Sequence, residues 1–170
     1  MIGASQIGAI MDHSSQTSSI RLANVDESNF DMAMQFVRQF YEHFNYPFEQ
    51  NRKRALLAEF MADESIGRLW LITQAGVAVG YTIVAFSFSL ERNGRVAFID
   101  ELFIDSTSRS AGIGATVLTE IEAWCVSVGV MTLRLEAEAS NERASALYMR
   151  CGYVDQHRRL LTKIHSGQHH

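Results

Sequence analysis

The chain of 170 residues contains little cysteine and almost no proline. Its two cysteines, Cys125 and Cys151, are too few for a disulfide framework, which excludes the small secreted scaffolds held together by several bridges. We therefore expect reduced thiols and a cytoplasmic protein. The single proline is Pro47, and a helix or a strand would be interrupted at that position.

Long apolar runs and an excess of positive charge are also missing. No stretch approaches the roughly 20 apolar residues that cross a bilayer, and the first residues lack the charged start and apolar centre of a signal peptide. The formal net charge of -4 argues against nucleic acid, because neutralising phosphates requires a basic surface. We therefore expect neither a membrane nor a nucleic acid as a partner.

What is present is the composition of one folded domain. The chain is 47% hydrophobic and 20% charged, which is ordinary for a globular protein, and it is long enough for one sizeable core. Residues 1–18 are rich in Ser, Gly and Gln and are predicted to be a flexible lead-in, and residues 165–170 a tail. A single domain is predicted over residues 19–164.

The spacing of apolar residues predicts an α+β fold. Alternation predicts strands over residues 19–25, 68–73, 77–90, 96–104, 131–137 and 158–164. Helical spacing, with Asp26 as a plausible first cap, predicts helices over residues 30–44, from about 49, 114–129 and 142–150. Short turns join the three central strands into an antiparallel meander, and the helix after Gly114 connects two strands as a parallel crossover.

A glycine-rich loop, RSAGIG at residues 109–114, joins a predicted strand to a predicted helix. Glycine at 112 and 114 would let the backbone approach a ligand closely, since no Cβ intervenes. The amides at the start of the helix favour phosphate, and Arg109 could add a charge-assisted contact. A tight turn without any ligand is the alternative.

Two common phosphate sites do not fit this loop. A dinucleotide fingerprint requires a third glycine where Val117 stands, and it follows a parallel sheet. A P-loop requires four residues between its glycines and then a lysine followed by Ser or Thr, whereas here one residue separates the glycines and Ala115 stands in place of the lysine. The diphosphate of coenzyme A remains.

The segment IDELFIDSTSRSAGIGATVLTEIEAW resembles the acetyl-CoA binding motif of the GNAT superfamily of N-acetyltransferases, R-x-x-G-x-G or R-x-x-G-x-A, with Arg109, Gly112 and Gly114 in its positions. A second segment, LRLEAEASNERASALYMRCGY, is similar to another motif of this family through Asn141, Tyr148 and the Gly152-Tyr153 pair. The resemblance covers about residues 19–164. It implies a GNAT-like, mostly antiparallel sheet flanked by helices, with a splayed parallel strand pair holding the coenzyme.

The resemblance also implies which residues contact acetyl-CoA. These are Leu102, Phe103, Ile104, Arg109, Ser110, Ala111, Gly112, Ile113, Gly114, Ala115, Asn141, Ala144 and Tyr148. The loop departs from the family where members often carry glycine and a basic residue, at Ser110 and Ala111. We therefore expect backbone amides to carry most of the diphosphate binding.

Asn141 and Tyr148 are seven residues apart, which is two helical turns and about 10 Å along one stripe. That span suits an extended pantetheine arm, with Asn141 bonding an amide of the arm and Tyr148 near the sulfur. Tyr148 would then protonate the leaving thiolate. In the alternative interpretation, Tyr148 is a core residue of an apolar helix face shared with Ala144, Leu147 and Cys151.

Two adjacent acids, Asp100 and Glu101, lie inside the apolar strand FIDELFI. Buried charge is costly without compensation, so one of them should face a cleft. Strict alternation places Glu101 on the face of Ile99 and Phe103, and it places Asp100 on the opposite face, with Phe98, Leu102 and Ile104. The alternative is an ion pair with an arginine of a neighbouring strand, such as Arg134 or Arg68.

The resemblance, together with these residues, implies an N-acetyltransferase that moves an acetyl group from acetyl-CoA to a primary amine of a small molecule or peptide, by direct attack in a ternary complex. Asp100 or Glu101 would act as base, a backbone N–H near 102–104 would meet the oxyanion, Tyr148 would act as acid, and no metal is needed. Aromatic residues of the two N-terminal helices should wall the acceptor groove. The alternatives are a Cys151–His157 nucleophile pair and a non-catalytic acyl-CoA sensor, and a homodimer is left open.

Overall fold

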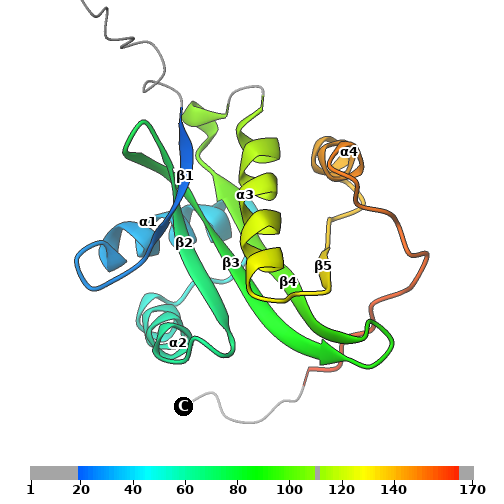
Figure 1. Ribbon diagram of the computed structural model, residues 1–170. Helices are drawn as coiled ribbons and strands as arrows, with labels where there is room; N and C mark the ends of the chain where they lie inside the picture. The colour runs from blue at the N-terminus through cyan, green and yellow to red at the C-terminus, as the bar shows by residue number, and fades with distance from the viewer. Residues whose placement is uncertain (1–18, 110–111, 165–170) are drawn as a thin grey trace, which may run out of the picture.

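A computed structural model describes residues 19–109 and 112–164 (Figure 1). Its centre is one five-stranded sheet in which the strands follow each other in chain order: β1 (Ile20–Asn24), β2 (Gly67–Gln74), β3 (Val77–Ser89), β4 (Gly94–Ile104) and β5 (Thr132–Leu135). β1 to β4 are antiparallel, and β5 runs parallel to β4. The α+β fold with one parallel crossover is thereby confirmed. The predicted lead-in and tail lie outside the described residues.

Helices cover both faces of the sheet (Figure 1). α1 (Phe30–His43) and α2 (Gln50–Ala62) pack on one face, and α3 (Ile113–Ser127) packs on the other. A short 3₁₀ turn, η1 (Ser106–Ser108), follows β4, and α4 (Glu142–Arg150) lies beyond β5. α4 is amphipathic but contributes no fully buried residue, so its anchoring is the lightest of the four helices.

Side chains at the helix starts explain where the helices begin. Glu49 caps α2 by accepting hydrogen bonds from two amides of its first turn, which matches the predicted start. Asp26, in contrast, does not cap α1. Its carboxylate accepts from the amide and hydroxyl of Ser28, and the helix begins only after Asn29, so this expectation is wrong.

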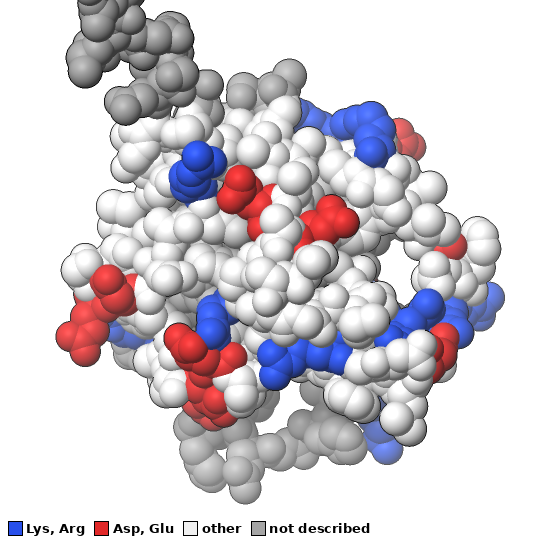
Figure 2. Space-filling model, viewed as in Figure 1, with Lys and Arg blue, Asp and Glu red and all other residues white. Residues whose placement is uncertain are grey.

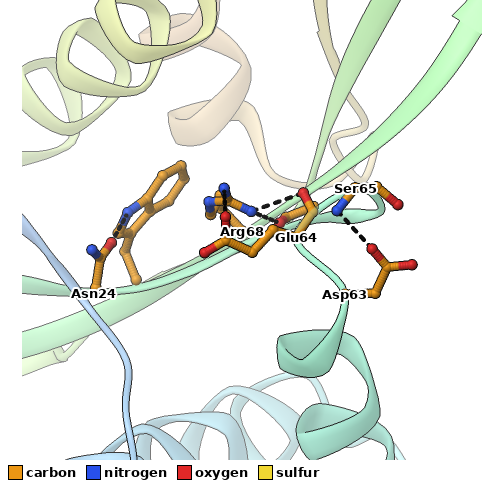
Figure 3. A network of polar contacts seen from close by, with 7 residues as sticks. Asn24, Asp63, Glu64, Ser65 and Arg68 are labelled. Carbon is orange, nitrogen blue, oxygen red and sulfur yellow. Dashed lines mark hydrogen bonds and ion pairs between the residues drawn. The ribbon is translucent and has the colours of Figure 1, made fainter. Parts of the chain in front are cut away.

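Polar contacts fix the entry of β2 into the sheet (Figure 3). The Asp63 carboxylate accepts from the Ser65 amide at 2.8 Å, which ends α2 in a tight turn. Arg68 folds back and donates to the carboxylate of Glu64 at 2.5 Å. The Trp70 indole donates to the Asn24 side chain of β1 at 3.0 Å, which ties the first two strands together.

The core consists of two apolar clusters, one on each face. The cluster beneath α3 includes Ile72, Val84, Ile99, Val117 and Ile121, all at most 4% exposed. The cluster beneath α1 and α2 is built around Tyr81 and Phe103 with aromatic residues of α1. The sheet therefore separates two apolar layers, and both contain aliphatic and aromatic side chains.

The predicted strand over residues 158–164 is wrong. The chain from Gly152 onward has no regular structure among the described residues, and His157 turns it with a φ of 52°. It is held by exposed polar contacts, chiefly Arg158 to Glu91 of the β3–β4 turn. Leu161 and Ile164 remain 87% and 88% exposed, so their alternating pattern finds no neighbouring strand to pair with.

Acidic and basic side chains are interspersed on the face shown in Figure 2, and neither sign covers it. In the part of the chain that the structure describes, no helix is both long and apolar enough to cross a bilayer.

Candidate active site

The parallel pair of strands separates halfway along β4. β5 pairs with β4 only from Val96 to Ile99, whereas β4 continues to Ile104 and pairs there with β3 alone. On the side of β5, the backbone groups of residues 100–104 therefore have no strand partner among the described residues. This splayed edge offers N–H and C=O groups to a ligand.

A cavity of about 920 Å³ lies at this splayed edge. Its walls come from α1, the second half of β4, the start of α3, the loop after β5, and α4. The structure brings to this one cavity every predicted site residue that it describes: Asp100, Glu101, Leu102, Phe103, Ile104, Arg109, Gly112, Ile113, Gly114, Ala115, Asn141, Ala144 and Tyr148. Ser110 and Ala111 lie outside the described residues.

The start of α3 presents backbone amides to the cavity. Gly112 precedes the helix with a φ of +108°, a conformation that favours glycine. The amides of Ile113, Gly114 and Ala115 have no hydrogen-bond partner among the described residues, and the helix dipole adds positive potential there. This geometry fits a diphosphate.

Position 114 favours glycine for a different structural reason than position 112. A Cβ at this position would lie 2.8 Å from Cδ2 of Leu147, so the missing side chain lets α4 approach α3 closely. The sequence predicts that this glycine makes room for a ligand, and Gly114 does line the cavity, while its missing side chain also makes room for α4.

Arg109 is folded against the end of β4. Its Nε donates to the carbonyl of Ile104 at 2.8 Å, and its guanidinium lies 5.7 Å from the centre of the Phe103 ring. Arg109 lines the cavity, and the other N–H groups of its guanidinium have no hydrogen-bond partner among the described residues, which leaves them available to an anion.

Asn141 and Tyr148 reach the cavity from one helix. Asn141 Oδ1 accepts from the amide of Ala144 at 3.1 Å, which leaves its amino group as the available donor. The Tyr148 hydroxyl has no hydrogen-bond partner among the described residues, and its ring packs edge-on against Tyr153. Burial raises the pKa of Tyr148, so the phenol is protonated and able to donate at neutral pH.

A β-bulge sets the orientation of the acid pair. Ile83 pairs with Glu101 and Val84 pairs with Ile99, so Asp100 is the extra residue of the bulge. The bulge shifts the alternation by one residue. Ile99 packs beneath α3 while Glu101 faces the α1 side with Phe103, so the prediction that Ile99 and Glu101 share a face is wrong.

Tyrosines, and not an arginine, hold Glu101. Tyr81 donates to Oε2 at 2.6 Å and Tyr41 donates to Oε1 at 3.1 Å, while Lys53 donates to the Tyr41 hydroxyl at 2.6 Å. Arg68 pairs with Glu64, and within residues 19–109 and 112–164 no ion pair joins Asp100 or Glu101 to an arginine. The alternative interpretation, an ion pair with an arginine of a neighbouring strand, is therefore wrong.

Sequence reasoning missed Tyr81 and Lys53 entirely. The available signal was a tyrosine inside the apolar strand VAVGYTIVAF, because a buried hydroxyl requires a partner. Tyr81 is fully buried, and Glu101 on the adjacent strand is that partner.

The surroundings raise the pKa of both acids. Burial is the main cause for Glu101, and the charge of Asp100 adds to it, whereas Tyr81, Tyr41 and Lys53 act in the opposite direction. Loss of water in the cavity raises the pKa of Asp100, and Lys53 again opposes the shift. A raised carboxyl pKa suits a group that must accept a proton near neutral pH.

The Cys151–His157 pair gains no support from the geometry. The His157 side chain is 88% exposed and lies 3.6 Å from Asp155, and in the described ranges no hydrogen bond joins it to Cys151. Nor do those ranges contain a group of three or more His, Cys, Asp or Glu side chains arranged to hold a metal ion.

Residues 32–153 match the model of the acetyltransferase (GNAT) family, which is more than half of the chain. The chain belongs to the GNAT family. This GNAT protein is 26% identical over 106 residues to YhfO of Bacillus subtilis, described as an uncharacterized N-acetyltransferase; the match covers 62% of this chain and 70% of YhfO. Membership confirms the resemblance seen in the two motifs. It makes the protein an acyltransferase and supports an acyl-CoA as its donor.

Solved structures share the fold of this GNAT protein. The integron cassette protein HFX_CASS3, from the mobile metagenome of Cole Harbour Salt Marsh, superposes with a TM-score of 0.75 at 23% identity, covering 88% of this chain and 91% of that one. The aminoglycoside N-acetyltransferase AAC(6')-Iy in complex with CoA superposes with a TM-score of 0.71 at 13% identity, covering 86% and 95%.

Proposed function

We propose that this GNAT protein is an N-acetyltransferase that moves the acetyl group of acetyl-CoA to a primary amine of a small molecule or peptide. The observation that carries the proposal is the single cavity of about 920 Å³ that the glycine loop, the splayed edge of β4, the acid pair and Tyr148 all line. Both substrates can meet in it, so the transfer needs a ternary complex and no covalent enzyme intermediate.

The donor end of the cavity is the start of α3. The amides of residues 112–115 and the Arg109 fork hold the diphosphate, because they combine unpaired N–H groups with positive potential. The splayed edge of β4 and the amino group of Asn141 bond the amides of the pantetheine arm. When bound, acetyl-CoA supplies the acetyl group as a reactive thioester.

The acceptor end contains the base. Alkyl amines are protonated at neutral pH, and Glu101, oriented by two phenols and assisted by Asp100, removes that proton directly or through a water. A backbone N–H of residues 102–104 stabilises the oxyanion as the amine attacks. As the C–S bond breaks, Tyr148 gives its proton to the leaving thiolate, and the second proton that the nitrogen loses on forming the amide restores the phenol.

The walls of the acceptor end favour a cationic, partly apolar amine. Tyr41, Phe44 and Tyr46 from α1 and the turn after it face the cavity beside Asp100 and Glu101. Aromatic faces and carboxylates both attract an ammonium group. Aminoglycosides, polyamines, amino acid amides and short peptides are the acceptor classes to offer.

The test is to offer that panel of amines with acetyl-CoA and to measure the consumption of acetyl-CoA as the release of free thiol. We expect turnover with at least one class, and we expect Tyr148→Phe and Glu101→Gln each to lower kcat by roughly 10²-fold or more. Calorimetry should show unchanged acetyl-CoA affinity in Y148F, because the phenol acts on the leaving sulfur and not on the diphosphate.

Three outcomes would contradict different parts of the proposal. Tight acetyl-CoA binding without turnover on any amine favours the non-catalytic acyl-CoA sensor. No heat of binding with acetyl-CoA overturns the assignment of the donor end. A large loss in Asp100→Asn together with full activity in E101Q would move the role of base to Asp100.

A further inference from the structure

Lys53 lies on α2, outside the walls of the cavity, and yet it is linked to the acid pair. Its Nζ donates to the Tyr41 hydroxyl at 2.6 Å and lies 4.1 Å from the centre of the Tyr41 ring. Tyr41 in turn donates to Glu101. Three elements, α2, α1 and β4, are thereby joined by two hydrogen bonds in series.

We propose that Lys53 is a positioning residue of the acceptor site: its ammonium group orients the Tyr41 hydroxyl toward Glu101 and supplies the positive charge opposite that carboxylate. The inference rests on the proposed function in one respect, the role of Glu101 as base.

The numbers of donors and acceptors on Lys53 and Tyr41 determine which group donates in each of the two hydrogen bonds. An ammonium group has donors and no acceptor, so the Tyr41 oxygen must accept from Lys53. A phenol has one proton, and that of Tyr41 therefore goes to Glu101. Burial and the Glu101 charge raise the pKa of both Tyr41 and Tyr81, which keeps the two phenols protonated and able to donate.

The charge of Lys53 acts at short range. Because the two hydrogen bonds measure 2.6 and 3.1 Å, its nitrogen lies within about 6 Å of Glu101 Oε1, a separation at which an opposite charge lowers a carboxyl pKa by about one unit or more. Lys53 is half-buried, and none of the ion pairs in the described part of the chain involves it. Its charge is thus directed at the acid pair.

Other titratable and charged groups face the same cavity from every surrounding element. They are Asp100 of β4, His43 of α1, Tyr46 after α1, Arg109 before α3, Glu136 and Glu138 after β5, and Arg143, Tyr148 and Arg150 of α4. Tyr81 of β3 does not line the cavity but contacts Glu101 directly. Among the cations, Lys53 alone contributes to the pKa shifts of both acids. No ion pair joins these arginines to either acid in the described part of the chain.

The experiment follows the Glu101 carboxyl by ¹³C NMR in protein labelled at the glutamate side-chain carboxyl, with E101Q identifying its resonance. In Lys53→Met we expect the midpoint of the Glu101 titration to move to higher pH by about one unit. Lys53→Arg should restore most of the shift. Tyr41→Phe should also raise the midpoint, because Glu101 loses one donor and the link to Lys53.

Arg54 provides the matched control. It is the next residue of α2 and its charge is paired with Asp31 at the start of α1, at 2.6 Å. Arg54→Met removes a neighbouring positive charge from the same helix, and the Glu101 midpoint should not move. Equal midpoints in the wild type and K53M, or equal shifts in K53M and R54M, overturn the inference. If K53M does not fold, K53R against Lys53→Gln gives the same comparison.

Kinetics separate this inference from the proposed function. With an active amine, the acid limb of kcat/KM should move to higher pH in K53M, while the rate well above that limb is largely retained. If E101Q keeps full turnover, the role of Glu101 as base fails, and the NMR titration still decides whether Lys53 tunes this carboxyl.

Discussion

At the scale of single residues, Glu101 shows how a charge is kept inside an apolar strand. Two phenols donate to its two oxygens, and a lysine lies behind one of them. The sequence predicts that the acid pair needs compensation, because its neighbours are apolar. It cannot identify the partners, since Tyr41 and Lys53 are 60 and 48 positions away and only tertiary packing brings them near.

The raised pKa of Glu101 has a defined effect on stability. A carboxyl whose pKa is higher in the folded than in the unfolded state contributes stability below its unfolded value of about 4.3, and this contribution is lost as pH rises through the folded pKa. Gln at this position does not titrate. We therefore expect the stability of Glu101→Gln relative to the wild type to improve as pH rises from about 4 to about 7.

Urea unfolding of both proteins across that pH range measures the difference directly. Asp100→Asn should show the same sign, because the pKa of Asp100 is also raised. A difference that stays constant with pH, or that falls, would show that the folded-state pKa of Glu101 is not elevated.

At the scale of elements, the close approach of β3 and β4 shapes the site. Periodicity predicts the meander and the crossover helix, because turn residues bound each strand of the meander and Gly112 and Gly129 bound the helix. It does not predict the bulge at Asp100, since an extra residue leaves no mark in an apolar pattern. It also fails at residues 158–164, where alternation is present and a partner strand is not.

Substitutions at two glycines of the β2–β3 hairpin test how much the fold depends on the short distance between β3 and β4. A Cβ on Gly80 would lie 2.0 Å from the backbone oxygen of Phe103, so Gly80→Ala must push β3 away from β4 and should cost about 3 kcal/mol or more. Gly76 has open space around it and a φ of +80°. Gly76→Ala should therefore cost only about 1 kcal/mol, as conformational strain.

Chemical denaturation of the two variants gives the comparison, and acetyl-CoA affinity gives a second readout. G80A should also weaken coenzyme binding, because Gly80 pairs with Ile104 at the splayed end of β4. Similar losses of stability in both variants would mean that β4 can move away from a Cβ at position 80 without a further cost in folding free energy.

At the scale of the whole molecule, the site exists because segments far apart in the chain meet at one cavity. The two motifs predict the donor end, and the resemblance to the GNAT family places them together. The aromatic wall from α1 and the link through α2 depend on how two N-terminal helices pack across the sheet. No local pattern encodes that packing, so these parts became visible only in the structure.

Binding at such a site should stabilise the entire fold. A ligand that binds only the folded state adds about 2.7 kcal/mol at a concentration 100 times its Kd. We expect coenzyme A to raise the Tm accordingly, whereas NAD should leave it unchanged, because the loop lacks a dinucleotide fingerprint. A thermal shift with NAD and none with coenzyme A would contradict the assignment of the glycine loop.

The light anchoring of α4 has one further consequence. Because no residue of this helix is fully buried, it has little enclosed apolar surface to hold it against the body of the protein when the cavity contains only water. A pantetheine arm lying along its inner stripe would enclose that surface and act as interior packing. The coenzyme would then be a reactant and, for the duration of each catalytic cycle, also a structural part of the enzyme that uses it.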